Sequence, residues 1–289
     1  MVIGGLLMKI AVVTDSGSGL TQQEAKAKGL FYLPLQIVDN EKTYLDGVDV
    51  GIEEIFSMIK EGKMLKTSLP PLGLVENMFK KMKTDGYEHI ICISLTAGIS
   101  STMQSIMIAA EEAKMPISCV ECYSTCYIQQ YLAMAAKRLV DEGIELEVIL
   151  QRLQESITHS NTLIVPDDLD HLKRGGRLTP VAAALGGMLK IKPILQLNET
   201  SQGKIDTFAK VRTMSKALQN AVDSFEKEGI DENYILVVLH TDALETAEQL
   251  KEMYFNKYPH HETIFGYIGP VISVHTGIGC VGLQYIKKV

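Results

Sequence analysis

A strand, a turn of small residues and a helix follow one another between Tyr87 and Lys114. Residues 89–93 (HIICI) form an apolar run of the length that a buried strand needs. A turn at 96–101 (TAGISS) follows, and from Thr102 the apolar residues recur at helical spacing. This order of elements favours an α/β fold.

The turn itself is a candidate ligand site. Ser100 or Ser101 is expected to be the N-cap of the helix, since a side-chain oxygen there accepts a hydrogen bond from a free helical N–H group. Free N–H groups and the positive end of the helix dipole attract anions, and ligands of open α/β sheets bind at the carboxyl ends of strands. A serine that only caps the helix is the alternative interpretation.

The alternation of strand and helix continues through the first half of the chain. Strands are expected at 9–15, 31–38, 89–93 and 117–120, and helices at 22–28, 52–61, 74–83, from 102, at 129–142 and at 146–159. Residues 43–47 are expected to form a turn, and 66–71 a loop that Pro70 keeps extended. Asp15, after the first strand, is expected to stabilise a turn. The pattern predicts a three-layer α/β domain with a parallel sheet at residues 8–158.

The second half predicts an α+β domain at residues 159–289. Strands are expected at 163–165, 191–197, 205–211, 234–240, 264–267, 271–275 and 281–287, and helices at 169–173, 181–189, 212–228 and 243–258. The Gln202-Gly203 turn indicates a hairpin, so the sheet should be largely antiparallel. The apolar run 181–195 is expected to line a slot or to be ordinary core.

Charge and cysteine content argue against several classes of protein. The net charge of −7 disfavours nucleic acid as a partner, and no apolar run approaches the roughly 20 residues of a membrane span. The five cysteines are an odd number, and the group at 119–126 has no second cysteine or histidine group at zinc spacing. No metal and no cofactor are therefore expected. Residues 1–7, whether native or derived from a vector, are too short for a signal peptide. We therefore expect a cytoplasmic protein.

Two basic residues in the second half are candidate anion ligands. Arg177 follows Gly175 and Gly176, and its planar guanidinium suits a carboxylate or a phosphate. His275 precedes the glycine-rich turn 276–279 (TGIG). A surface arginine and a structural histidine are the alternatives for these two residues.

The order of these pieces resembles the DegV family of bacterial fatty-acid-binding proteins, over residues 8–289. The matching stretches are Asp15-Ser16, Thr67-Ser68-x-Pro70, Gly98-Ile99-Ser100-x-Thr102-x-Gln104-Ser105, Leu172-Lys173-x-Gly175-Gly176-Arg177, Lys192-Pro193-Ile194, the Gly203 turn with Arg212, and His275-Thr276-Gly277-x-Gly279. Ser101 stands where the family usually has glycine, and Glu121-Cys122 where it tends to have Asp-Ser.

The resemblance implies a long-chain fatty acid in a tunnel between the two domains. It implies that Thr67 and Ser100, with Ser101 beside it, hold the carboxylate, and that Arg177 and His275 lie at the same mouth. It also implies a carrier protein and not an enzyme: a separate fatty-acid kinase phosphorylates the carboxylate, and the protein then carries the acyl phosphate. A transient contact with a membrane surface is left open.

Two other functions remain as alternatives. A serine-dependent acyl hydrolase could use Ser100 as nucleophile and His275 as base, although the turn lacks the second glycine of a nucleophile elbow. A phosphate-ester-binding protein is the other alternative, although the sequence has neither a P-loop nor a dinucleotide fingerprint.

Overall fold

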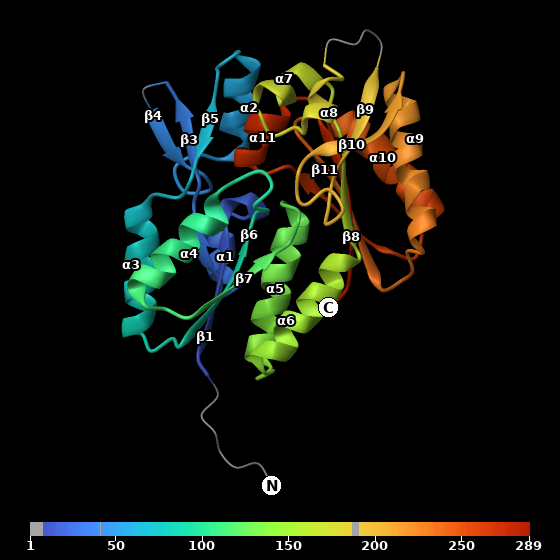
Figure 1. The fold of residues 1–289 in the computed structure, drawn as a ribbon. Helices are drawn as coiled ribbons and strands as arrows, with labels where there is room; N and C mark the ends of the chain where they lie inside the picture. The colour runs from blue at the N-terminus through green and yellow to red at the C-terminus, as the bar shows by residue number, and fades with distance from the viewer. Residues whose placement is uncertain (1–7, 41, 187–190) are drawn as a thin grey trace.

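The computed structural model describes residues 8–40, 42–186 and 191–289, and its first sheet is parallel (Figure 1). The strand order is β2-β1-β6-β7, and all three pairings are parallel. The strands are β1 (Ile10–Asp15), β2 (Phe31–Leu33), β6 (His89–Ser94) and β7 (Ile117–Glu121). The α/β architecture predicted for the first half is confirmed.

Helices cover both faces of this sheet because its central strands are apolar on both sides. Ala11 and Ile90 face a cluster with α3 (Leu72–Thr84) and α4 (Thr102–Ala113). Val12 and Ile91 face the opposite cluster, which contains α5 (Tyr127–Asp141) and α6 (Leu146–Thr158). The short helix α1 (Gln22–Ala27) follows a 3-10 turn at Ser16–Ser18. These helices give the three layers that the sequence predicts.

The second sheet has the order β10-β9-β8-β13-β11-β12 and is antiparallel apart from the β11–β12 pair. Its strands are β8 (Ser160–Val165), β9 (Lys192–Leu197), β10 (Asp206–Val211), β11 (Tyr234–His240), β12 (Glu262–Tyr267) and β13 (Val281–Lys287). Gln202 and Gly203 both have positive φ in the connection between β9 and β10. The α+β interpretation of the second half and its hairpin are confirmed.

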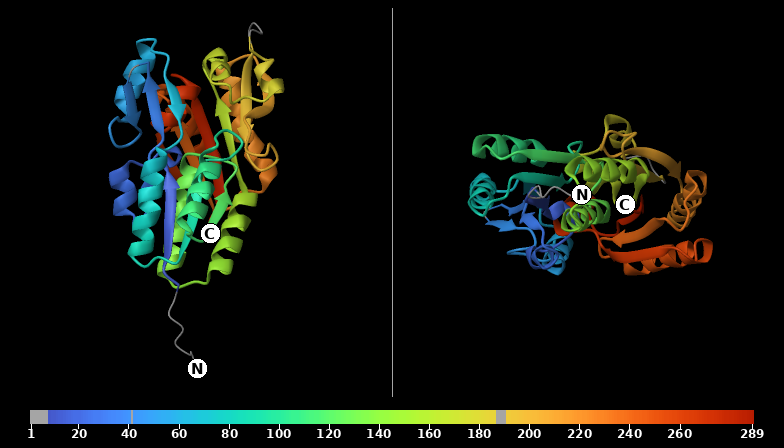
Figure 2. Two further views of the ribbon diagram at one scale, coloured as in Figure 1. Left: turned by 60° about the vertical axis from the view of Figure 1, so that its left-hand side comes forward. Right: turned by 90° about the horizontal axis from the view of Figure 1, so that it is seen from below.

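The two large sheets lie on either side of α5 and α6 (Figures 1 and 2). One apolar cluster joins Val12 of the first sheet and Leu132 of α5 to Ile164 of the second sheet. The outer face of the second sheet packs on α9 (Met214–Ser224), the 3-10 turn Phe225–Glu228 and α10 (Leu244–Lys257). The division of the chain at residues 158 and 159 stays a prediction, and it falls between α6 and β8.

Three predictions in the first half were wrong, because tertiary pairing overrides the local turn signals. The strand expected at 31–38 is interrupted at Pro34, and its second part, β3 (Gln36–Asp39), joins another sheet. The expected turn at 43–47 is largely a strand, β4 (Lys42–Leu45), and the expected loop at 66–71 begins with β5 (Lys66–Ser68). Both pair antiparallel with β3, which becomes the centre of a three-stranded sheet.

The strand expected at 271–275 is a helix, α11 (Pro270–Thr276). Pro270 occupies the first turn, where proline favours a helix, and Val271 and Val274 bury one face against α2 (Ile52–Lys60). The remaining helices are α7 (Leu169–Arg174) and α8 (Pro180–Ala183). Of the helix expected at 181–189, residues 187–189 lie outside the described part of the chain.

Candidate functional site

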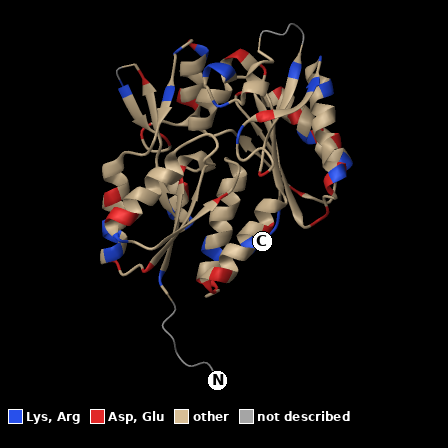
Figure 3. Ribbon diagram, viewed as in Figure 1, with Lys and Arg blue, Asp and Glu red and all other residues tan. Residues whose placement is uncertain are grey.

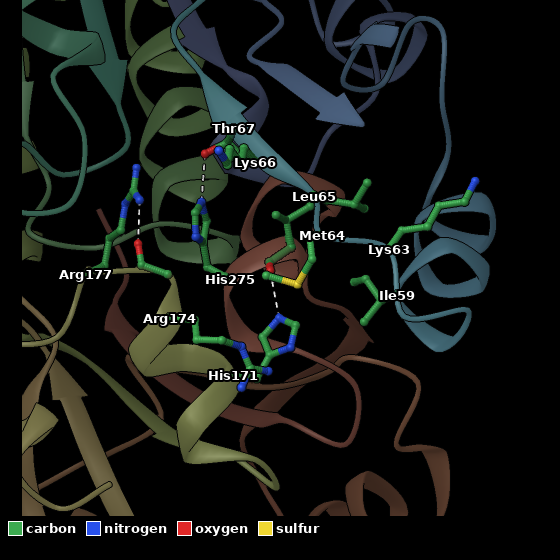
Figure 4. Close-up of a pocket in the computed structure, with 12 residues that line it drawn as sticks. Ile59, Lys63, Met64, Leu65, Lys66, Thr67, His171, Arg174, Arg177 and His275 are labelled. Atoms are coloured by element: carbon green, nitrogen blue, oxygen red, sulfur yellow. Dashed lines mark hydrogen bonds between the residues drawn. The ribbon is translucent and has the colours of Figure 1, made fainter. Parts of the chain in front are cut away.

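Thr67 and His275 meet between the small sheet and α11. Thr67 sits in the middle of β5, where its pairing with Ile37 of β3 fixes it. His275 lies in the last turn of α11. The hydroxyl of Thr67 lies 2.7 Å from Nε2 of His275, so the two side chains share a hydrogen bond whose donor depends on the histidine tautomer (Figure 4). The structure therefore brings together two of the predicted site residues.

The imidazole of His275 packs against the backbone of Gly175. A Cβ atom at position 175 would lie 2.9 Å from Nδ1 of His275, so the first glycine of the Gly-Gly-Arg motif leaves room for the ring. Burial, with smaller contributions from the nearby Arg177 and His171, lowers the pKa of His275 to about 4. At neutral pH the ring is uncharged, with one nitrogen as donor and the other as acceptor.

Arg177 lines the same cavity as His275 and follows a turn of the backbone at Gly176. Gly176 has φ of +73°, a conformation that glycine adopts at little cost, and the guanidinium then folds back so that Nη1 donates to the carbonyl of Gly175 at 2.5 Å (Figure 4). Among the residues that the structure describes, no carboxylate forms a salt bridge with Arg177. Its remaining N–H donors are available to an anion.

The serines before α4 have different positions. Ser101 is the N-cap residue, but its exposed side chain makes no capping hydrogen bond. The hydroxyl of Ser100 accepts instead from the N–H of Thr102 at 3.3 Å and lies 2.8 Å from the Thr102 hydroxyl. The expected N-cap position is therefore held by Ser101 without a side-chain cap, and the preceding Ser100 accepts from the first N–H of α4.

Three adjoining cavities meet at these residues. The basic vestibule, about 290 Å³, is lined by Lys63, Lys66, His171, Arg174, Arg177 and His275 together with Thr67 and apolar residues of 59–65. The second cavity, which we call the apolar slot, has a volume of about 50 Å³. The third, the outer cleft, has a volume of about 440 Å³, and its lining includes Ser100 and Ser101. In Figure 3 the blue positions of lysine and arginine include parts of β5 and α7, the elements that carry Lys66 and Arg174.

The five predicted site residues differ in which of these cavities they line. Thr67 and Arg177 line all three, and His275 lines the vestibule and the slot. Ser100 lines the slot and the outer cleft, whereas Ser101 lines the outer cleft alone. Four of the five residues thus lie at the mouth of the slot, and Ser101 lies on its outer rim.

The walls of the slot come from both halves of the chain. Leu35, Leu95 and Ile99 belong to the first half, and Ile164, Leu172, Leu197, Ile205, Val271 and Ile272 belong to the second. The sequence did not single these wall residues out, because alternation along a strand separates inside from outside but not a slot from a core. The run expected to line a slot, 181–195, supplies none of the described lining residues, and its residues 187–190 lie outside the description.

A buried carboxylate holds the loop that leads to α4. Asp15 accepts hydrogen bonds from the N–H groups of Gly17 (2.8 Å) and Leu95 (3.0 Å), the Ser94 hydroxyl (2.6 Å) and the Gln129 amide (2.9 Å). Burial raises the pKa of Asp15, and these four donors oppose that shift. The prediction that Asp15 stabilises a turn is confirmed, and the same carboxylate fixes the start of the segment that carries Ser100.

The described hydrogen bonds do not pair Ser100 with His275. The hydroxyl of Ser100 bonds to Thr102, and the imidazole of His275 bonds to Thr67, so the described contacts contain no pair of Ser100 with a base. Across the part of the chain that the structure describes, no three His, Cys, Asp or Glu side chains gather to hold a metal ion. Of the helices described, none is long and apolar enough to cross a membrane.

Comparison with known proteins gives one consistent family. A family model described as "Uncharacterised protein, DegV family" matches residues 9–288. A DegV domain-containing protein of Halalkalibacterium halodurans is 34% identical over 286 residues, which are 98% of this chain and 100% of that protein.

Two solved structures are similar over nearly the whole chain. A fatty acid binding DegV family protein from Streptococcus agalactiae has a TM-score of 0.89 at 30% identity, covering 98% of this chain and 100% of that one. DegV, a fatty acid binding protein from Bacillus subtilis, has a TM-score of 0.86 at 30% identity, covering 97% and 100%.

Proposed function

The chain belongs to the DegV family, and from that premise we propose that it binds a long-chain fatty acid. The carboxylate lies at the mouth formed by Thr67, Ser100, Arg177 and His275, and the acyl chain enters the apolar slot. The observation that supports the proposal is that these four polar side chains line the same slot as a set of aliphatic side chains, with Thr125 and Thr276 as its other polar residues.

The mouth offers what a carboxylate needs when it leaves water. Removing an ionised carboxylate from water costs several kcal/mol unless hydrogen bonds replace its hydration. When Nε2–H of the neutral His275 donates to the Thr67 hydroxyl, the Thr67 O–H is left to donate to the carboxylate, and the Ser100 hydroxyl and the N–H groups of Arg177 supply further bonds. Bonds to a charged group contribute about 1.5–3 kcal/mol each, so a few of them offset the loss of hydration.

The slot supplies most of the affinity. Each buried CH₂ of an acyl chain contributes about 0.8 kcal/mol. The cavity of about 50 Å³ is well below the roughly 300–1,000 Å³ of typical ligand pockets, so the walls must separate to admit a long chain. Part of the wall comes from residues outside the sheets, such as Ile99 in the turn before α4 and Ile272 in the first turn of α11, and we expect rotation of these side chains to open the space. The proteins of S. agalactiae and B. subtilis are described as fatty acid binding, which supports this assignment.

We further propose that the protein presents the carboxylate to a separate fatty-acid kinase and then carries the acyl phosphate. The vestibule outside the mouth is lined by lysine, arginine and histidine and by no acidic residue. Such a surface stabilises the additional negative charge of a phosphoryl group. The protein is then a substrate-presenting carrier that does not catalyse the transfer, and the need for ATP places it in the cytoplasm.

Native mass spectrometry of the purified protein, followed by organic extraction, tests the proposal. We expect close to one fatty acid per chain after expression in a bacterial host. A protein that emerges without lipid and, after delipidation, takes up no fatty acid contradicts it. Release of nitrophenol from a short-chain ester, lost on Ser100→Ala, would favour the hydrolase instead.

A further inference from the structure

A second cavity lies away from the fatty-acid mouth and shares none of its described lining residues. Its volume is about 350 Å³, within the range of small-molecule sites. The start of α1, the loop between β4 and α2, the start of α5 and the end of β12 form its walls. We call it the acidic cavity, because Glu24 and Asp46 are the acidic residues in its described lining.

Its chemistry is the opposite of that of the basic vestibule. The described lining of the acidic cavity contains no lysine, arginine or histidine, whereas the vestibule contains six such residues. Glu24 makes the interior negative, ionisation of Asp46 adds to this charge, and a low-dielectric wall strengthens the field. A cavity of this kind favours a cation and disfavours a fatty acid or a phosphate.

Asp46 provides an unused acceptor in the wall. Its side chain is 1% exposed, and Oδ2 accepts from the N–H of Val271 at 3.2 Å. Oδ1 is buried and has no hydrogen-bond partner among the described residues. Burial raises the pKa of Asp46 to about 7, opposed mainly by the nearby hydroxyl of Ser16. A positive charge in the cavity offsets the cost of burying this carboxylate.

Aromatic side chains form another part of the wall. Tyr127 of α5 and Tyr267 of β12 line the cavity, and Tyr267 is 55% exposed, whereas the ring of Phe265 packs in the cluster on the outer face of the second sheet. The face of an aromatic ring attracts an ammonium group, and its apolar surface packs against a hydrocarbon or aromatic body. The lining therefore suits a ligand that is charged at one end and apolar at the other.

We propose that the acidic cavity binds a small organic cation, a primary amine with an apolar or aromatic body. The ammonium group lies on the side of Asp46 and Glu24, and the body lies against the aromatic rings. This site is independent of the fatty-acid site, because the two have different walls and opposite charge.

The test uses the full chain and phenethylamine as probe, with 2-phenylethanol as the neutral molecule of similar shape. Calorimetry should show saturable binding of the amine and at least about ten-fold weaker binding of the alcohol, the size expected for a hydrogen bond to a charged group. Asp46→Asn keeps the shape of the side chain but removes its charge, so it should weaken amine binding by a similar factor and leave the alcohol unaffected.

A second variant blocks the cavity without touching its charges. Gly266 lies in β12, and a Cβ atom there would meet only Cδ2 of Leu239, at 3.8 Å, so Gly266→Ile fits the strand. This variant should lose amine binding while its fatty-acid binding, measured as a check of folding, stays at the wild-type level. The proposal would be overturned if the wild type showed no saturable amine binding, or if it bound amine and alcohol with equal affinity. It would also be overturned if Gly266→Ile still bound the amine, or if a fatty acid displaced the amine.

Discussion

The hydroxyl of Thr67 lies 2.7 Å from Nε2 of His275, although the two residues are 208 positions apart in the chain. Thr67 is held by the small sheet of the first half, and His275 by the last turn of α11 in the second. Their hydrogen bond therefore joins the two halves at the mouth of the apolar slot. The predictions below follow from this arrangement.

Thr67→Val should weaken fatty-acid binding by about 1.5–3 kcal/mol, because valine keeps the shape of threonine but removes a hydrogen bond to a charged carboxylate. Calorimetry with palmitic acid measures the loss. Ser68→Ala is the matched control, since Ser68 is the exposed neighbour in β5. A fatty alcohol of the same length should bind both variants alike, so an equal loss for acid and alcohol would indicate a packing defect instead.

Ser100→Ala should cost a similar amount of fatty-acid affinity, whereas Ser101→Ala should cost little. Ser100 lines the slot, and Ser101 lines only the outer cleft with an exposed side chain. Parallel titrations of the two variants with one fatty acid compare them directly. A larger loss for Ser101→Ala would place the carboxylate outside the slot.

Gly175→Ala should disturb the site without removing a polar group. The new Cβ would lie 2.9 Å from Nδ1 of His275, so the ring must move away from Thr67. We expect a loss of about 1–3 kcal/mol in the free energy of unfolding, as for other overpacked sites, together with weaker fatty-acid binding. Urea unfolding measures the first effect. Gly73→Ala in α3, where a Cβ meets no atom within 4 Å, is the control and should leave both quantities near wild type.

The free energy of unfolding should fall between pH 6.5 and pH 4 because of His275. Its pKa is lowered from 6.5 to about 4 in the folded protein, so the unfolded chain takes up a proton first as the pH falls. Folding stability rises with pH wherever the unfolded state binds more protons, so the contribution of His275 decreases through this window and is constant above it. The difference between wild type and His275→Asn, followed by urea unfolding at several pH values, isolates this residue. A difference that does not change with pH would contradict the assignment.

Arg177→Ala should impair transfer to a fatty-acid kinase more than it impairs fatty-acid binding. In the proposed site the hydroxyls of Thr67 and Ser100 bind the carboxylate, whereas phosphoryl transfer would add negative charge beside the vestibule. An interaction that strengthens only as this charge develops raises the rate without raising ground-state affinity. Calorimetry and acyl-phosphate formation with a cognate kinase and ATP measure the two effects. Loss of binding with normal turnover of bound acid would reverse the roles given to these residues.

The sequence alone determined the main architecture, because the signals for it are local. The apolar centre of β1, the run at β6 and the helical spacing from Thr102 predict the parallel sheet, and the Gln202-Gly203 turn predicts the hairpin. Of the two glycines in the Gly-Gly-Arg motif, Gly176 has a local reason, because it supplies a positive φ. Gly175 makes room for the ring of His275, which only the tertiary structure brings beside it.

The tertiary structure decided the elements whose partners are distant in the chain. Residues 66–68 are a strand because β3 pairs with them, although Pro70 and Pro71 nearby favour a loop. The β-branched run that begins at Val271 favours a strand locally, yet it is a helix because α2 packs against its buried face. The walls of the apolar slot and the acidic cavity were likewise beyond local reasoning. Periodicity states which side of an element is buried, but the cavity that two buried sides enclose depends on how distant segments pack.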